Sequence, residues 1–192
     1  ISACLVGSEM CIRDSLSSSA TVLADNPSLT VRWSELDSES QRLVDEAELR
    51  QPVRVIVDSQ NRVTPDHKLI EQLGETWLMR QQVDDRHWPE TVTQIPVPLR
   101  DSQLDLVALM MVLGQRQINS VWVEAGATLA GALIQAGLVD ELIVYVAPKL
   151  LGNDARGLCQ LAGLTQLADA PVFAFRDIRQ VGDDVRLTLT PQ

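Results

Sequence analysis

The sequence predicts a three-layer α/β fold, with a mixed but mostly parallel sheet, helices on both of its faces and an antiparallel hairpin at the C-terminal end. Short β-branched runs alternate with helical patterns through the middle of the chain, which is typical of parallel strands joined by helices. The last two apolar runs are instead joined by a turn, and we expect this hairpin to add antiparallel strands at one edge of the sheet. At 192 residues, 45% of them hydrophobic, the chain is long enough for one domain with a substantial core.

Seven runs carry a strand pattern and two carry a helix pattern. Strands are expected where short apolar runs are bounded by turn residues, at residues 53–58, 76–79, 94–97, 121–124, 142–147, 172–178 and 185–190. We expect those at 121–124 and 142–147 to be buried. A Gly-Asp pair at 182–183 joins the last two as a hairpin. Apolar residues at helical spacing predict helices at 104–115 and 128–136, the second ending at Gly137. Residues 34–49 are polar and acidic, so we expect a partly helical surface excursion and not a second domain.

Composition excludes several classes of protein. Sixteen basic side chains against 26 acidic ones give a net charge of 16 − 26 = −10. Nucleic acid is not an expected partner, because the sequence has no Lys/Arg cluster. A membrane span is not expected, because no stretch approaches about 20 uninterrupted apolar residues. The cysteines, Cys4, Cys11 and Cys159, form no CxxC pair, so we expect no disulfide framework, no metal site and a reducing, cytoplasmic location.

Residues 1–15 differ from the rest of the chain, because they have neither a strand period nor a helix period. They also lack the basic leader and apolar core of a signal peptide. We interpret them as a non-native or disordered head; a natural, weakly ordered N-terminus is the alternative. The domain is therefore expected to comprise residues 16–192.

The most informative stretch is VWVEAGATL at residues 121–129. A strand runs into small residues and then into a helix, whose first N–H groups lack internal partners and can bind a pyrophosphate. Gly126 would let the backbone approach such a ligand closely. Glu124 stands at the carboxyl end of the strand, where open α/β sheets bind ligands. A tight packing turn at Gly126 and a structural hydrogen bond from Glu124 are the alternatives.

A second stretch, ATVLADNPSLTVR, places polar groups on both sides of a turn. Thr21 and Asp25 precede the Asn-Pro pair at 26–27, which disfavours helix, and Arg32 follows it. An arginine can donate two hydrogen bonds to one phosphate, so the turn is suited to a phosphorylated ligand. An Asx-type turn with a surface arginine is the alternative.

A third stretch, VIVDSQNRVTP, carries two signals that point to opposite cofactors. Asp58 directly follows a strand, where an acid often binds the ribose hydroxyls of NAD. Arg62 lies four residues further on, where an arginine accommodates the additional phosphate of NADP. A strand-terminating turn explains the same residues equally well. The residues alone therefore decide neither between NAD and NADP nor between a cofactor site and a structural turn.

Together these stretches resemble signature segments of the reductase domain of bacterial riboflavin biosynthesis. The longest is VWVEAGATLAGALIQAGLVDELIVYVAPKLLG. The resemblance implies a dihydrofolate-reductase-like fold, a cytoplasmic homodimer and NADPH as cofactor. It implies reduction of 5-amino-6-(5-phosphoribosylamino)uracil to the ribitylamino product, by hydride transfer to C1′ of the ring-opened ribose.

The resemblance also implies roles for individual residues. Glu124 is expected to contact the substrate and to be the catalytic residue, and the further substrate contacts are Leu29 and Arg32, the latter toward its phosphate. Asp58 is expected to be mainly structural. The residues expected to bind NADPH are Thr21, Asp25, Ser59, Gly126, Ala127, Thr128, Leu129, Ala130, Gly131 and Ala132. Ala125 replaces a glycine frequent in the family, which is tolerable if the φ of this residue is negative.

One part of the family pattern has no match. The family's domain opens with a strand that carries a lysine and a Ser-x-Asp-Gly turn, followed by a helix with further substrate contacts. Nothing in residues 1–15 resembles that segment, so we expect the domain to lack its first strand and helix. Two alternatives to an active riboflavin-pathway enzyme follow: a related pterin or pyrimidine reductase, and an inactive truncated fragment.

Overall fold

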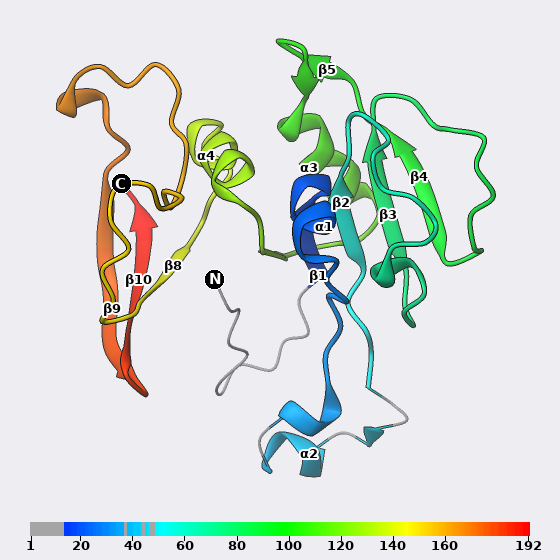
Figure 1. Cartoon of the computed structure of the whole chain (residues 1–192), viewed down its shortest axis with the longest axis horizontal. Coiled ribbons are helices and arrows are strands. Elements are labelled where there is room, and N and C mark those ends of the chain that lie inside the picture. Colours follow the sequence, from blue (N-terminus) through cyan, green and yellow to red (C-terminus); the bar gives the residue numbers. More distant parts are fainter. Residues whose placement is uncertain (1–13, 37, 44, 47–48) are drawn as a thin grey trace. The chain divides into compact units, whose positions relative to one another are not determined.

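The computed structural model describes residues 14–36, 38–43, 45–46 and 49–192. Most of the predicted head, including Cys4 and Cys11, lies outside the described residues. Four residues of the predicted surface excursion, at 37, 44 and 47–48, do so as well. The chain divides into two compact units, Ile1–Ala125 and Gly126–Gln192, each of which has its own sheet (Figure 1).

The first unit is built on a five-stranded sheet with the order β4-β3-β2-β1-β7. Its strands are β1 (Asp14–Ser18), β2 (Arg54–Val57), β3 (Thr76–Arg80), β4 (Val92–Pro96) and β7 (Val121–Val123). All neighbouring pairs are parallel, and Figure 1 shows the arrowheads of β2, β3 and β4 at the same edge. The carboxyl ends of the strands therefore share one edge, which we call the carboxyl edge.

One face of this sheet is covered by α1 (Ser19–Asp25), which follows β1 without a loop. Ser18 caps the helix, because its hydroxyl accepts a hydrogen bond from the backbone N–H of Thr21. Val22 of the helix belongs to a buried cluster with Ile56 of β2 and Leu78 of β3. Burial of this cluster fixes α1 against the sheet.

The opposite face is covered by α3 (Leu106–Gln115). Asp105 caps it by accepting hydrogen bonds from two backbone N–H groups. At its other end the guanidinium of Arg116 lies 5.2 Å from the ring centre of Trp77. Trp77 points away from its strand neighbour Leu78, because successive strand residues face opposite sides. The predicted arrangement, with helices on both faces, is therefore confirmed.

β1 is unusually polar for the middle of a parallel sheet, where near-continuous apolar runs are usual. The carboxylate of Asp14 accepts hydrogen bonds from the backbone N–H of Val53 at 3.0 Å and from Arg50 at 2.7 Å. The hydroxyl of Ser17 donates to the carbonyl of Glu124 at 2.6 Å. Since β1 begins at Asp14, the expected end of the head falls inside this strand.

Short elements complete the first unit. They are η1 (Trp33–Glu35), α2 (Ser40–Leu43), η3 (Lys68–Ile70), and a two-stranded ribbon of β5 (Leu99–Arg100) and β6 (Gln103–Leu104). The short turns of η1 and α2 agree with a partly helical excursion. Figure 1 shows this segment beyond the amino ends of the strands, away from the carboxyl edge.

The second unit combines one helix with an antiparallel sheet in the order β8-β10-β9. Its elements are α4 (Ala127–Gln135), β8 (Leu142–Val146), η4 (Leu167–Asp169), β9 (Phe173–Val181) and β10 (Asp184–Pro191). The predicted hairpin is confirmed, since β9 and β10 pair in antiparallel register. Across the described parts of both units, no helix is long and apolar enough to cross a membrane.

Helix boundaries follow local chemistry. α4 ends as predicted before Gly137, whose φ of 65° is the left-handed geometry that favours glycine. α3 begins two residues later than the apolar spacing predicts, at Leu106. The side chain of Asp105 accepts hydrogen bonds from N–H groups of the first turn, which makes Asp105 the N-cap of α3. Leu104 therefore lies outside the helix, and it belongs to β6.

Two expectations about the sheets are corrected. The sequence predicts that residues 121–124 and 142–147 form buried strands, yet Val123 of β7 is 38% exposed and Val146 of β8 is 48% exposed. Each of these strands is an edge strand with a neighbour on one side only. The hairpin, expected at an edge of the parallel sheet, instead forms a separate sheet with β8. Strand β10 is already bonded along both sides, to β8 and to β9.

A buried polar network holds the end of β3. Arg80 and Asp58 are both fully buried and pair at 3.0 Å. Arg80 also bonds the carboxylate of Asp84 and the amide oxygen of Gln94, at 2.7 and 2.6 Å. The ring of Trp88 lies 5.0 Å from its guanidinium. A buried charge is tolerated when it is paired and hydrogen-bonded in this way.

Replacing this arginine should therefore destabilise the protein strongly. We expect Arg80→Met to lower the free energy of unfolding by about 3–5 kcal/mol, because it leaves the buried carboxylate of Asp58 without its ionic partner. Urea unfolding followed by tryptophan fluorescence measures the change. The matched control, Arg100→Met on the exposed ribbon, should cost less than about 0.5 kcal/mol; equal losses in the two variants would contradict the role of the network.

Candidate functional site

Glu124 directly follows β7 at the carboxyl edge. Its backbone N–H donates to the carbonyl of Leu16 at 2.9 Å, and its own carbonyl accepts from Ser17. The main chain at this residue is thus held to β1. The side-chain Oε1 accepts a hydrogen bond from the indole N–H of Trp122 at 3.0 Å. Oε2 has no partner among the described residues, so it is available to a ligand.

The electrostatic environment of Glu124 favours its neutral form. Burial raises the pKa of the Glu124 carboxyl above its ordinary value, and the hydrogen bond from Trp122 offsets part of this rise. A half-buried carboxyl with a raised pKa, at the edge where parallel sheets bind ligands, has the properties of a functional group. The structural alternative for Glu124, a hydrogen bond to the adjacent loop, is not seen among the described residues: its backbone bonds β1, and its Oε1 bonds Trp122 of β7.

Two of the predicted cofactor contacts lie on α1. Thr21 is half-buried in the first turn, and Asp25 is exposed in the last. Residues four apart occupy the same side of a helix, so both side chains lie on one face of α1. Val22, between them in the sequence, faces the core.

In the loop after β2, Asp58 and Arg62, which favour different cofactors in the sequence, have different environments. The carboxylate of Asp58 is turned inward, where it accepts from the backbone N–H groups of Arg62 and Val63 at 2.9 and 3.1 Å and pairs with Arg80. The structural role expected for Asp58 is therefore confirmed. Ser59 is exposed, and the guanidinium of Arg62 reaches the hydroxyl of Ser19 at 2.9 Å.

The two further predicted substrate contacts, Leu29 and Arg32, lie in the segment after α1. The backbone of Val31 is hydrogen-bonded in both directions to the side-chain amide of Gln51, which precedes the amino end of β2. Arg32 is therefore placed toward the amino ends of the strands, where it pairs with the exposed carboxylate of Glu35. Leu29 has a φ of 51° and packs partly against the core cluster under α1. The structure therefore does not place Arg32 at the carboxyl edge.

The start of α4 has the features predicted for it. Gly126 is the N-cap, with no side-chain cap, and a Cβ built there would meet no atom within 4 Å. Close packing against protein atoms therefore does not explain this glycine. Ala125 is not among the described residues with positive φ, so it satisfies the condition for replacing glycine. Gly126 and Thr128 are exposed, and the N–H groups of the first turn have no helical acceptors.

Further along α4, the segment predicted to bind the cofactor packs against the chain at Gln160. A Cβ at Gly131 would lie 1.8 Å from the carbonyl oxygen of Gln160, so the absence of a side chain is what lets the two backbones approach. Gln160 also donates to the carbonyl of Ala127 and accepts from the hydroxyl of Thr128. Leu129 and Gly131 are buried. The remaining members are half-buried, namely Ala127, Ala130 and Ala132.

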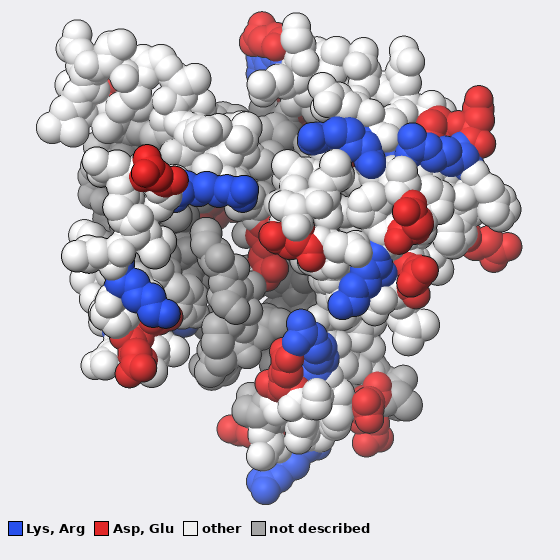
Figure 2. All heavy atoms as spheres, in the orientation of Figure 1, with Lys and Arg blue, Asp and Glu red and all other residues white. Residues whose placement is uncertain are grey.

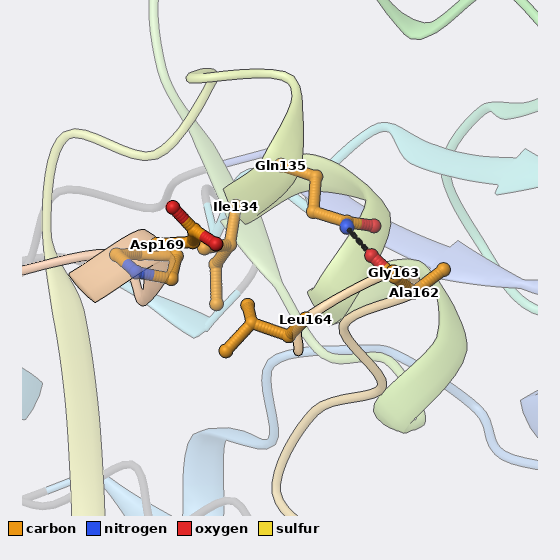
Figure 3. Close-up of a pocket in the computed structure, with 7 residues that line it drawn as sticks. Ile134, Gln135, Ala162, Gly163, Leu164 and Asp169 are labelled. Carbon is orange, nitrogen blue, oxygen red and sulfur yellow. Dashed lines mark hydrogen bonds between the residues drawn. The ribbon is translucent and has the colours of Figure 1, made fainter. Parts of the chain in front are cut away.

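A hollow of about 300 Å³ lies in the second unit beside the end of α4 (Figure 3). It is lined by Ile134, Gln135, Ala162, Gly163, Leu164, Asp169 and Pro171. A hydrogen bond of 2.8 Å from the amide of Gln135 to the carbonyl of Ala162 closes one wall. The lining contains none of the predicted cofactor residues, and its single charged group is Asp169. The hollow therefore does not coincide with the predicted site.

Charges of both signs are interspersed on the surface. Figure 2 shows single Lys and Arg side chains next to Asp and Glu on the face in view. Among the residues that the structure describes, no group of three or more His, Cys, Asp and Glu side chains is arranged to hold a metal ion. A ligand site in this protein is therefore to be sought in the individual polar groups at the carboxyl edge and at the start of α4.

Comparison with known proteins identifies the family. Residues 2–187 match the RibD C-terminal domain. The chain belongs to this family. The riboflavin biosynthesis protein RibD of Escherichia coli (strain K12) is 66% identical over 174 residues, which cover 91% of this chain and 47% of that protein. The chain thus spans about half the length of such RibD relatives.

A shorter relative and a solved structure agree. The 5-amino-6-(5-phosphoribosylamino)uracil reductase of Buchnera aphidicola (subsp. Acyrthosiphon pisum) is 43% identical over 177 residues, covering 92% of this chain and 86% of that protein. The structure of Acinetobacter baumannii RibD is 32% identical with a TM-score of 0.75, covering 93% of this chain and 47% of that one. The predicted family and its α/β reductase fold are therefore confirmed.

Two contacts at the carboxyl edge are absent from the sequence-based expectations. The bond from Trp122 to Glu124 was open to prediction, because residues two apart in a strand face the same side. The bond from Arg62 to Ser19 was not, because it joins residues 43 apart and depends on β1 and β2 being neighbours. Such a contact becomes visible only once the strand order is known.

The raised pKa of Glu124 predicts a specific dependence of stability on pH. The folded state holds the proton more tightly than the unfolded state, so stability is lost as pH rises from the ordinary pKa of a glutamate through the raised one. We expect Glu124→Gln to gain stability relative to the unmodified chain between about pH 4 and about pH 7. Urea unfolding at both pH values measures this. The exposed control Glu90→Gln should show no such trend. If the difference in free energy of unfolding between Glu124→Gln and the unmodified chain were the same at both pH values, the raised pKa would be disproved.

Proposed function

We propose that this chain catalyses the NADPH-dependent reduction of 5-amino-6-(5-phosphoribosylamino)uracil to its ribitylamino product, in the cytoplasm. The Buchnera relative, 86% of which is covered at 43% identity, carries the name of that reductase. The single observation that carries the proposal is Glu124, a half-buried carboxyl at the carboxyl edge with one oxygen held by Trp122 and the other unpartnered. That group is suited to orient a polar substrate.

The residues present fit a nicotinamide dinucleotide. In the first unit the proposed contacts are Thr21 and Asp25, on one face of α1, and the exposed Ser59. In the second unit they are residues 126–132, where the nine-residue helix α4 begins with open space beside Gly126. Free N–H groups at such a helix start bind phosphate groups. When bound, NADPH supplies the hydride, and the protein binds and orients the reactants.

Glu124 is proposed to position the substrate. Trp122 holds Oε1, which fixes the plane of the carboxyl group and leaves Oε2 to accept a hydrogen bond from a hydroxyl or amino group. Because burial raises the pKa of the Glu124 carboxyl, it is also suited to hold a proton closer to neutral pH than an exposed glutamate. A carboxyl that exchanges a proton with the ribityl chain is consistent with a reaction that needs no protein nucleophile.

Leu29 and Arg32 are proposed as further substrate contacts, with Arg32 binding the phosphate. Arg32 would exchange Glu35 for the phosphate, and an exposed ion pair of this kind contributes only about 0–1 kcal/mol. Arg32 itself lies toward the amino ends of the strands, next to Val31, which bonds Gln51.

Substrate-dependent oxidation of NADPH tests the function. We expect Glu124→Gln to lower kcat/KM for the phosphoribosylaminouracil by about 10–100-fold, the loss of one hydrogen bond to a charged group. The dissociation constant of NADPH should change by less than about 3-fold, since Glu124 is not among its proposed contacts. Absorbance at the NADPH band gives the rate, and fluorescence titration gives the affinity.

Glu90→Gln, an exposed carboxylate with no proposed contact, should leave both constants unchanged. Equal losses of substrate use and NADPH affinity in Glu124→Gln would remove its substrate role. Oxidation that depends on a pterin but not on the phosphoribosylaminouracil would assign the chain to a related reductase. Binding of NADPH without turnover of either substrate would indicate an inactive fragment.

A homodimer is also proposed, and one face of the second unit supports it. Val185, Leu187 and Leu189 alternate along β10, so they face the same side of the sheet. Their cross-strand partners on β8 and β9 are apolar for the most part, with Ile178 and Phe175 among them. Phe175 and Ile178 are 61% and 58% exposed. A second copy of the chain would remove this apolar surface from water.

A charge placed on this face should disrupt such a dimer. We expect the unmodified chain to elute as a dimer and Ile178→Asp to elute as a monomer, because burying an unpaired carboxylate is unfavourable. Size-exclusion chromatography with light scattering measures the mass. Asp183→Lys, at the exposed turn of the same hairpin, is the control and should remain dimeric. A monomeric unmodified chain would rule out the proposed interface.

A further inference from the structure

Asp58 and Arg62, the two charged residues after β2 that favour different cofactors, differ in their exposure. Asp58 is fully buried, and its oxygens are engaged by Arg80 and by the backbone N–H groups of Arg62 and Val63. It cannot also accept hydrogen bonds from the hydroxyls of a ribose. Arg62, by contrast, is exposed. Of the two groups, the cation alone is accessible to a ligand.

Arg62 lies between two predicted cofactor contacts of the first unit. Its backbone follows exposed Ser59 by three residues, in the loop at the carboxyl end of β2. Its Nη2 donates at 2.9 Å to the hydroxyl of Ser19, two residues before Thr21 at the start of α1. The neighbouring strands β1 and β2 run parallel, so the segments that follow them meet at the carboxyl edge. The guanidinium therefore joins the segments that carry Thr21 and Ser59.

Among the residues that the structure describes, no carboxylate pairs with Arg62. Within the described part of the chain its guanidinium forms no ion pair, and Ser19, a neutral hydroxyl, is its one hydrogen-bond acceptor. The carboxylate of Asp58, which bonds the backbone N–H of Arg62, pairs with Arg80 instead. The other N–H groups of the planar fork have no partner among the described residues, and this fork matches the oxygens of a phosphate. The site is suited to a phosphate monoester beside a ribose.

We propose that Arg62 binds the 2′-phosphate of the cofactor's adenosine ribose and thereby selects NADPH over NADH. This assignment rests on the proposed function, because it concerns the same cofactor. The competing role for Arg62 is that of a tether, which holds the start of α1 to the loop after β2 through Ser19. The two roles differ in what they predict, since a phosphate contact affects one dinucleotide and a tether affects both.

Titration of the 192-residue chain with NADPH, NADH, 2′,5′-ADP and 5′-AMP tests the assignment. We expect Arg62→Gln to raise the dissociation constants of NADPH and 2′,5′-ADP by about 10–100-fold, as for the loss of a hydrogen bond to a charged group. Those of NADH and 5′-AMP should change by less than about 3-fold. Added salt should weaken NADPH binding more than NADH binding in the unmodified chain and equally in Arg62→Gln, because salt screens the phosphate contact.

Three variants act as controls. Ser19→Ala removes the tether but keeps the cation, so selectivity for NADPH should persist. Arg62→Lys keeps the charge without the fork and should fall between the unmodified chain and Arg62→Gln. Arg100→Gln removes an exposed positive charge on β5 and should change nothing.

The outcomes separate this assignment from the function on which it rests. If NADPH binds and Arg62→Gln keeps its preference over NADH, the assignment fails and the proposed function stands. If Ser19→Ala and Arg62→Gln weaken both dinucleotides to the same extent, Arg62 is a tether and the assignment also fails. If the unmodified chain binds neither dinucleotide, the proposed function and the assignment fall together.

Discussion

The buried carboxylate of Asp58 is the interaction on which the first unit most depends. It joins the end of β2 to the end of β3 through Arg80, and it folds the loop after β2 back on itself through the N–H groups of Arg62 and Val63. A buried charge without these partners would cost several kcal/mol, so the groups have to form together. One consequence is functional: by facing inward, Asp58 leaves Arg62 as the accessible charge of the loop.

The carboxyl edge illustrates how a parallel sheet assembles a site from distant parts of the chain. Ser19 follows β1, Ser59 and Arg62 follow β2, and Glu124 follows β7, yet the strand order makes their positions adjacent. No one of these residues would identify a site alone. The bonds from Arg62 to Ser19 and from Ser17 to the Glu124 carbonyl show that the segments meet. In open α/β sheets this edge is where ligands bind.

The sequence predicts the elements better than it predicts their partners. The strands and helices follow from local patterns, and Gly137 and Asp105 mark helix ends through their own backbone and side-chain chemistry. Pairing depends on residues far apart, so neither the separate β8-β10-β9 sheet nor the exposure of the edge strand β7 could be derived from apolar runs. The same holds for the site: the position of Glu124 follows from its place after a strand. That Arg32 lies toward the opposite edge depends on Val31 bonding Gln51 across the fold.

The polarity of β1 has a consequence for how uniquely the sheet is aligned. Leu16 is its one apolar side chain, so burial of apolar surface does little to choose among alignments. Hydrogen bonds do so instead. A slip of one residue would turn Leu16 toward α1 and would remove Asp14 from the N–H of Val53 and Ser17 from the carbonyl of Glu124. Directional polar contacts thus fix the register of the central strand. Because Ser17 bonds the carbonyl of Glu124, the same contacts fix the position of Glu124 relative to that strand.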